Sequence, residues 1–217
     1  RVHDVTTSEA SMTLRYAPGE SFVNSKQRRV PVSLDAPVFT LTHAMGFKGV
    51  LGGEYNFNRT EASIWKRFWL PASWGKIDCS VKAGAEWNTV PFPLLILPEA
   101  NLSYITQRET FCLINNMEFL NDRFASMSIS YDMNGKLFNR IPLLKNLKWR
   151  EMFRVRALWG TLTDKNNPFK SSNPDLFRFP TRDGKFTSFV MDPKVPYVEA
   201  SVGIYNIFKL LHVEYVH

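Results

Sequence analysis

The chain has 217 residues, for which a single domain is the default, and its formal net charge is +7. Acidic residues are interleaved with basic ones, and no run of Lys and Arg is longer than the pair Arg28-Arg29, so no nucleic-acid partner is indicated. No apolar run reaches about 18 residues, which excludes a transmembrane helix but not a membrane protein built from strands.

The first half of the chain predicts four strands, because apolar and polar residues alternate there with a period of two. These strands cover residues 11–16, 38–47, 55–70 and 74–87. The fourth has the clearest pattern: every second residue from Ile77 to Trp87 is apolar, and Lys82 and Glu86 belong to its polar face. Residues 17–37 are polar and basic, and predict a long loop between the first two strands.

Residues 89–107 are apolar but contain Pro91, Pro93 and Pro98. Three prolines argue against a central strand, because proline lacks the N–H that a sheet ladder needs. We therefore expect a long apolar loop that lies against the rim of the sheet. Residues 108–120 are predicted to form a fifth strand.

The segments 123–135 and 147–163 show the strictest alternation and predict the sixth and seventh strands. In the first, Asp132 lies with serines and asparagine on the face opposite the apolar residues. In the second, the apolar face extends from Trp149 to Trp159. The opposite face carries Arg150, Arg154 and Arg156.

Two settings produce such strands. In a soluble sandwich the apolar face lies in the core, whereas in a transmembrane barrel it meets lipid and the polar face lines the lumen. Strand length favours the barrel, because about 9–11 residues cross a bilayer and soluble strands average about 5–6. Tryptophans near the strand ends are typical of the aromatic girdles of barrels. The tryptophans that we expect at the membrane interfaces are Trp74, Trp87, Trp149 and Trp159.

Two more strands are predicted, at 195–208 and from residue 211 onwards, which makes about nine antiparallel strands in all. Residues 138–147 connect the sixth strand to the seventh and are expected to hold one helical turn. Residues 164–194 predict a long polar loop, and long loops of barrels lie outside the cell. Strict alternation of strand direction then places 89–107 and 138–147 at the inner end.

The chain contains no recognisable catalytic or metal-binding constellation. None of its four histidines lies in a nucleophile-elbow or metalloprotease motif. His212 and Glu214 share one strand face, but a third ligand is not apparent. Cys79 and Cys112 are too few for a disulfide framework or a closed zinc site. The sequence therefore predicts a protein that is not an enzyme and has no cofactor.

The arginines of the seventh strand predict an aqueous or acidic environment, since an Arg in lipid near the midplane costs about 2–4 kcal/mol. The charged residues expected to line the lumen are Lys82, Glu86, Asp132, Arg150, Arg154, Arg156 and Glu199. Asp132 is the nearest candidate acceptor for the arginines, and Glu86, Glu118 or Glu199 could reach across. Such a charge ladder would fill and rigidify the lumen, or alternatively serve as a latch for a loop or a selectivity lining.

Three segments, 116–123, 138–151 and 196–208, resemble a Bacteroidota outer-membrane barrel family whose members are labelled carboxypeptidase-like regulatory domain proteins. The resemblance covers most of residues 52–217, and the block Ile141-Pro-Leu-Leu-Lys145 is its most specific part. It implies a barrel similar to that of the BamA-like outer-membrane assembly superfamily, with roughly sixteen strands. Residues 1–217 would then form a partial barrel domain, the C-terminal portion, and both chain ends predict a fragment.

The resemblance also implies an integral protein of the Gram-negative outer membrane, in contact with lipid and lipopolysaccharide. Its expected role is to assist the assembly or export of outer-membrane or surface proteins, with other outer-membrane proteins or lipoproteins as partners. The strands themselves leave open a passive pore or ligand-uptake barrel, and also a soluble β-sandwich binding module. The sandwich requires Val81, Ile129, Val155 and Val202 to lie in a packed core.

Overall fold

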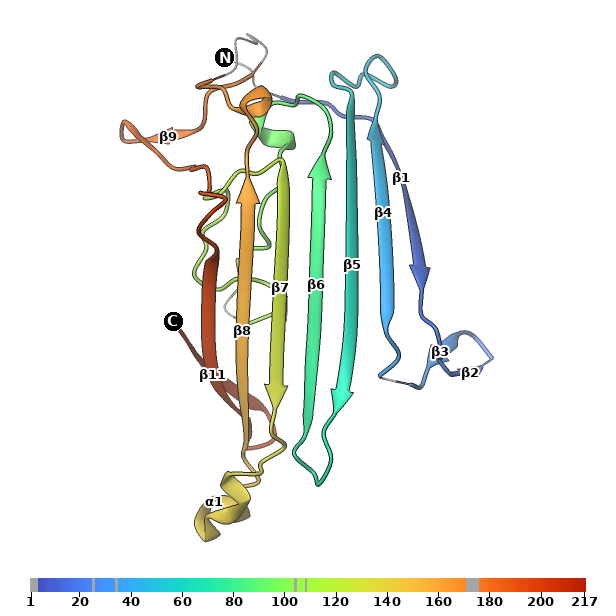
Figure 1. The fold of residues 1–217 in the computed structure, drawn as a ribbon, viewed down its shortest axis with the longest axis vertical. Coiled ribbons are helices and arrows are strands. Elements are labelled where there is room, and N and C mark those ends of the chain that lie inside the picture. Colours follow the sequence, from blue (N-terminus) through green and yellow to red (C-terminus); the bar gives the residue numbers. More distant parts are fainter. Residues whose placement is uncertain (1–3, 25, 34, 104, 108, 171–175) are drawn as a thin grey trace.

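The computed structural model describes residues 1–217 except 1–3, 25, 34, 104, 108 and 171–175. Eight long strands form one antiparallel sheet in the order β1-β4-β5-β6-β7-β8-β11-β12 (Figure 1). Their bounds are β1 Glu9–Tyr16, β4 Val38–Gly46, β5 Phe57–Trp69, β6 Lys76–Glu86, β7 Arg123–Asp132, β8 Arg150–Thr161, β11 Tyr197–Ile207 and β12 Leu211–Val216. The protein is therefore all-β, and its sheet is a meander in which each strand pairs with its neighbours along the chain.

The connections hold the remaining short elements. Two small hairpins are formed by β2 Phe22–Asn24 with β3 Arg29–Pro31, and by β9 Thr181–Arg182 with β10 Lys185–Phe186. The helical elements are η1 Phe92–Leu94, η2 Phe138–Arg140, α1 Pro142–Leu147 and η3 Asp164–Asn166. Among the described residues, no helix combines the length and the apolar character needed to cross a membrane.

Eight of the nine predicted strands are confirmed, with ends that differ by a few residues. The ninth prediction, a strand at 108–120, is wrong, because the described residues 109–120 make only bends, turns and isolated bridges. Its apolar residues do not alternate: Phe111 and Ile114, three positions apart, are both buried in one cluster. Glu118 accepts a hydrogen bond from the backbone N–H of Asn115, which closes a turn.

The missing strand changes which connections share an end of the sheet. Because β6 and β8 are both antiparallel to β7, the connections that follow β6 and β8 emerge at the same end, at the top of Figure 1. We call this the upper end. The predicted placement of 89–107 opposite 164–194 is therefore wrong. The lower end carries residues 70–75, 133–149 with α1, and 208–210 (Figure 1).

The two faces of the sheet differ in chemistry. The outer face is apolar and exposed. It presents Leu14, Leu41, Ile64, Val81, Ile129, Val155, Val202 and Tyr215, one from each strand. The exposed fraction of these side chains ranges from 36% for Ile129 to 72% for Tyr215. The four residues that a sandwich requires in its core are thus on an open surface.

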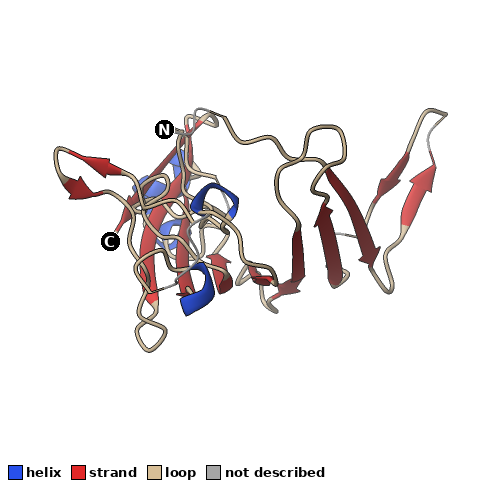
Figure 2. Ribbon diagram, turned by 90° about the horizontal axis from the view of Figure 1, so that it is seen from above, coloured by secondary structure: helices blue, strands red, loops and turns tan. Residues whose placement is uncertain are grey.

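The inner face is polar, and residues 87–103, 105–107 and 109–122 fold over it. We call these residues the inserted segment. Figure 2, which looks along the strands, shows the connections gathered over the half of the sheet that includes β7, β8 and β11. Two buried apolar clusters lie here. One comprises Phe57, Val90, Leu95, Leu120, Leu162 and Phe179, and the other Phe111, Ile114, Leu158 and Met191. The packed core is therefore small and lies between the inner face and the connections.

Candidate functional site

The arginines of β8 all point to the inner face, because residues two apart on a strand share a face. Arg154 and Arg156 are buried, whereas Arg150 at the lower end of the strand is exposed. The outer-face neighbour Val155 is 43% exposed, although it lies between two buried arginines. This inversion of the usual burial pattern makes the inner face the candidate functional site.

Arg156 forms the most deeply buried ion pair of the sheet. Its partner Glu199 lies directly opposite it on β11, with an Nη1–Oε2 distance of 3.3 Å. Both side chains are 1% exposed. The hydroxyl of Tyr197 donates a further hydrogen bond of 2.9 Å to Glu199. Charge-assisted hydrogen bonds of this kind are stronger than neutral ones, and a buried pair depends on having several of them.

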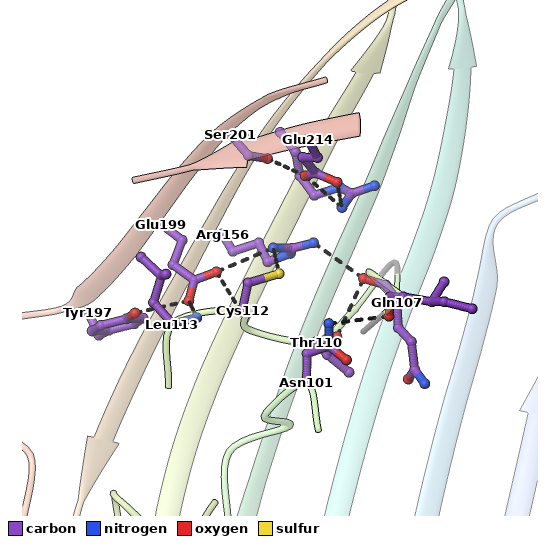
Figure 3. Close-up of polar contacts among 12 residues, drawn as sticks. Asn101, Gln107, Thr110, Cys112, Leu113, Arg156, Tyr197, Glu199, Ser201 and Glu214 are labelled. Atoms are coloured by element: carbon purple, nitrogen blue, oxygen red, sulfur yellow. Dashed lines mark hydrogen bonds and ion pairs between the residues drawn. The ribbon is translucent and has the colours of Figure 1, made fainter. Parts of the chain in front are cut away.

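The same ion pair holds the inserted segment against the sheet. Glu199 accepts hydrogen bonds from the backbone N–H groups of Cys112, at 2.9 Å, and Leu113, at 2.8 Å. Arg156 donates to the carbonyl oxygen of Gln107 at 3.3 Å, and its Nη1 lies 3.6 Å from Cys112 Sγ (Figure 3). One arginine and one carboxylate therefore bind three residues of the inserted segment, mainly through its backbone.

Arg154 pairs with Glu214, which lies on β12. Its Nη1 is 3.0 Å and 3.2 Å from the two carboxylate oxygens, and both side chains are almost fully buried. Ser201 on the intervening strand β11 donates a hydrogen bond of 2.5 Å to Glu214. His212 Nε2 lies 3.6 Å from the same carboxylate. This group ties the edge strand β12 to β8 across β11.

Asp132 lies near the lower end of the inner face. It accepts a hydrogen bond of 2.6 Å from Tyr205 and lies 3.6 Å from Lys76 Nζ. The Arg150 guanidinium lies 6.0 Å from the centre of the Tyr205 ring. The structure therefore gives Asp132 partners on β6 and β11, while the carboxylate that pairs with Arg154 comes from β12.

Lys82 and Glu86 lie farther up, on β6. Lys82 contacts Glu99 of the inserted segment. Glu86 is buried and lies 3.6 Å from Arg59 Nε, and Arg59 Nη2 donates a hydrogen bond of 2.5 Å to the carbonyl oxygen of Leu94. Both residues therefore belong to contacts that hold the inserted segment against the inner face. Neither forms an ion pair with an arginine of β8 in the part of the chain that the structure describes.

A cavity of about 650 Å³ opens below the inserted segment. Its lining includes Trp65, Asp78, Asp132, Arg150, Arg154 and Tyr205. Arg67 and Asp78 form a bidentate pair beside it, with N–O distances of 2.6 Å and 2.8 Å. Within the described part of the chain, no three His, Cys, Asp or Glu side chains are grouped so that they could hold a metal ion.

The four predicted interfacial tryptophans lie in two pairs. Trp74 precedes β6 and Trp149 precedes β8, both at the lower end, whereas Trp87 and Trp159 lie at the upper ends of the same two strands. Trp74, Trp87 and Trp159 are exposed, and Trp149 is partly buried.

Sequence reasoning missed Glu214 and Tyr205 as partners of the inner-face charges. The sequence places Glu214 on one strand face with His212. Its ion pair with Arg154 depends on the strand order β8-β11-β12. The hydrogen bonds from the backbone N–H groups of Cys112 and Leu113 to Glu199 cannot be recognised in the sequence. The predicted acceptor Glu118 instead bonds within its own turn.

The fold and the site define an all-β protein whose antiparallel sheet carries an apolar outer face and a charged inner face. A family model matches residues 2–169, and its description is the C-terminal domain of a family of unknown function, DUF5686. The match covers more than half of the chain, so the chain belongs to this family. No curated protein and no solved structure matches it.

Replacing Glu199 by Gln is expected to release the inserted segment. The substitution leaves Arg156 buried without its counter-charge, which costs about 3–5 kcal/mol, and turns an amide donor toward backbone N–H groups. We expect faster hydrogen exchange at the amides of Cys112 and Leu113. Glu109→Gln, an exposed change in the same segment, is the matched control and should leave exchange unchanged. Equal protection in both variants would contradict the anchoring role.

Arg154 and Glu214 are expected to behave as a coupled pair. Each single alanine substitution should lower the free energy of unfolding, measured by chemical denaturation. The free energy of unfolding of the double variant should fall by less than the sum of the two single decreases. The difference, which is the interaction free energy of the pair, is expected to be about 0.5–3 kcal/mol. Arg154→Ala combined with Glu20→Ala, near the far edge of the sheet, should be additive. Additivity in the first pair would show that the ion pair contributes nothing.

Proposed function

We propose that this chain is membrane-spanning and forms part of a β-barrel in the bacterial outer membrane. The support comes first from the outer face, where all eight long strands present apolar side chains to the surroundings. Monomeric soluble proteins rarely expose a contiguous apolar patch larger than a few hundred Å². Five of the strands, β5 to β8 and β11, have 10 to 13 residues, which is enough to cross a bilayer at a tilt.

The observation that carries the proposal is the direction of burial on β8. Arg156 is 1% exposed, whereas the adjacent Val155 is 43% exposed. In water this arrangement buries charge and exposes hydrocarbon, which is unfavourable on both counts. In a barrel it places the arginine in the lumen and the valine against lipid. The environment that makes this sheet stable is therefore a bilayer on its outer side.

The tryptophan pairs support a membrane of ordinary thickness. Trp149 and Trp159 are ten positions apart, which corresponds to about 33 Å along an extended strand. A tilt of about 40° reduces this to about 25 Å, the height of the apolar band of outer-membrane barrels. Among the described residues, β1 and β12 are each paired on one side only. In the proposed barrel, further strands pair with these two edges, because unpaired backbone groups are costly in lipid.

For the role of this barrel we propose assistance in the assembly or export of outer-membrane or surface proteins, without enzymatic activity. The support is the resemblance of the segments 116–123, 138–151 and 196–208 to a Bacteroidota outer-membrane barrel family, whose barrel is similar to that of the BamA-like assembly superfamily. The second candidate is a passive pore or uptake barrel, which the polar cavity of about 650 Å³ favours. The inserted segment covers the upper part of the inner face. This cover argues against a wide open channel through this part of the barrel.

Spin labels should separate lipid-facing from lumen-facing positions. In a Cys79→Ser/Cys112→Ser background, nitroxides at Val81→Cys and Val155→Cys are expected to collide with oxygen rather than with a water-soluble nickel chelate in reconstituted vesicles. A nitroxide at Ser63→Cys, on the inner face of β5, is the control and should show the reverse preference. Free access of the nickel chelate to Val81 and Val155 would reject the membrane-spanning proposal.

Depletion of the protein should distinguish the two roles. If the protein assists assembly, its loss is expected to lower the levels of other barrel proteins or surface lipoproteins in outer-membrane proteomics. Unchanged levels, together with steady conductance of the purified protein in planar bilayers, would reject assembly and favour the pore. A barrel variant with Glu199→Gln is the useful comparison, since release of the inserted segment should raise conductance only if the lumen conducts.

A further inference from the structure

The lower end of the sheet carries a basic surface that the inner-face site does not use. Residues 133–149, between β7 and β8, contain Lys136, Arg140, Lys145 and Lys148 and no acidic residue. Arg140, Lys145 and Lys148 are exposed, and none of them has an ion-pair partner among the described residues. We call residues 133–149, together with the β5–β6 turn at 70–75, the lower surface.

Large apolar side chains lie among these cations without any cover. Leu143 of α1 is 75% exposed, Ile141 is 48% exposed and Leu147 is 43% exposed. Leu143 and Leu147 are four residues apart and therefore share one side of the helix, whereas Lys145 projects from the opposite side. The short helix is thus amphipathic, with basic and apolar sides both open to the surroundings.

An open hollow lies next to this helix, between the β5–β6 turn and the β7–β8 connection. Its volume is about 390 Å³, and its lining residues are Ser73, Asn134, Lys136, Asn139 and Arg140. Every one of these side chains can donate hydrogen bonds, two are cationic, and none is acidic. Such a lining is suited to an anionic group with several acceptor oxygens, which is the chemistry of a phosphate.

The hollow adjoins a tryptophan of the predicted girdle. The ammonium of Lys136 donates a hydrogen bond of 2.7 Å to the carbonyl oxygen of Ala72 and lies 5.1 Å from the centre of the Trp74 ring. Trp74 itself is exposed. The cationic hollow is therefore continuous with the aromatic and apolar band of the outer face, where a lipid headgroup would meet it.

We propose that the lower surface binds the phosphate headgroup of an anionic phospholipid in the adjacent leaflet. This inference rests on the proposed membrane-spanning role. Lys136 and Arg140 bind the phosphate in the hollow, and α1 lies in the interface with Leu143 and Leu147 directed toward the acyl chains. Helices with a basic and an apolar side occupy this position in membranes. A nucleic acid or an acidic peptide would leave the exposed leucines in water.

The test uses the full-length protein in vesicles of phosphatidylcholine with phosphatidylglycerol. A fluorophore on Leu143→Cys, in the Cys79→Ser/Cys112→Ser background, is quenched by brominated phosphatidylglycerol or, in parallel, by brominated phosphatidylcholine. The ratio of the two gives the preference for the anionic lipid. Each cation near a membrane surface raises the affinity for anionic lipid about fivefold. Arg140→Gln is therefore expected to lower the preference for the anionic lipid about fivefold. Arg182→Gln, on the hairpin at the upper end, removes the same charge and should leave it unchanged.

Equal quenching by the two lipids, or equal effects of Arg140→Gln and Arg182→Gln, would overturn the proposal. Loss of the preference on adding inorganic phosphate, but not sodium chloride of equal ionic strength, would identify a site for free phosphate instead. A nitroxide at Val155→Cys in the same vesicles keeps the two proposals apart. Lipid contact at Val155 without quenching at Leu143 would reject only the headgroup site, whereas aqueous access at Val155 would reject the membrane-spanning role itself.

Discussion

The buried ion pair between Arg156 and Glu199 is the contact on which the inner face depends. It joins β8 to β11 and at the same time holds the backbone of the inserted segment at Cys112 and Leu113. A buried charge is tolerable only when its partners are complete, so these contacts must form together. The pair therefore determines both the register of two strands and the position of a segment that covers their inner face.

The proposed bilayer would accommodate both faces of this arrangement. The polar clusters and the two small apolar clusters lie on the same side of the sheet, between the strands and the connections. Nothing among the described residues packs over the valines and aromatic residues of the outer face. The stability of the sheet is thus divided between an interior of ion pairs and an exterior that a bilayer would solvate.

The strands were predictable because alternation over ten or more residues has few alternative explanations. The face of Arg154 and Arg156 followed from the same pattern. Glu199 was one of several candidate acceptors and is confirmed as the partner of Arg156, whereas Glu214 was not predicted. The two carboxylates lie 43 and 60 residues from their arginines, and strand order is what identifies the pairs. The strand expected at 108–120 failed for a related reason: Phe111 and Ile114 are apolar for packing against the inner face, and the backbone between them binds Glu199 rather than a neighbouring strand.

The meander also separates the contacts of the sheet by their distance along the chain. Neighbouring strands from β4 to β8 can pair as short-range hairpins, apart from the closure of the long loop that contains the inserted segment. Glu199 lies 87 residues beyond Cys112, so the contact that anchors the inserted segment is of longer range than the pairing of neighbouring strands from β4 to β8. Contacts of this range carry a larger loop-closure entropy, so the position of the inserted segment depends on a contact that is costly to close.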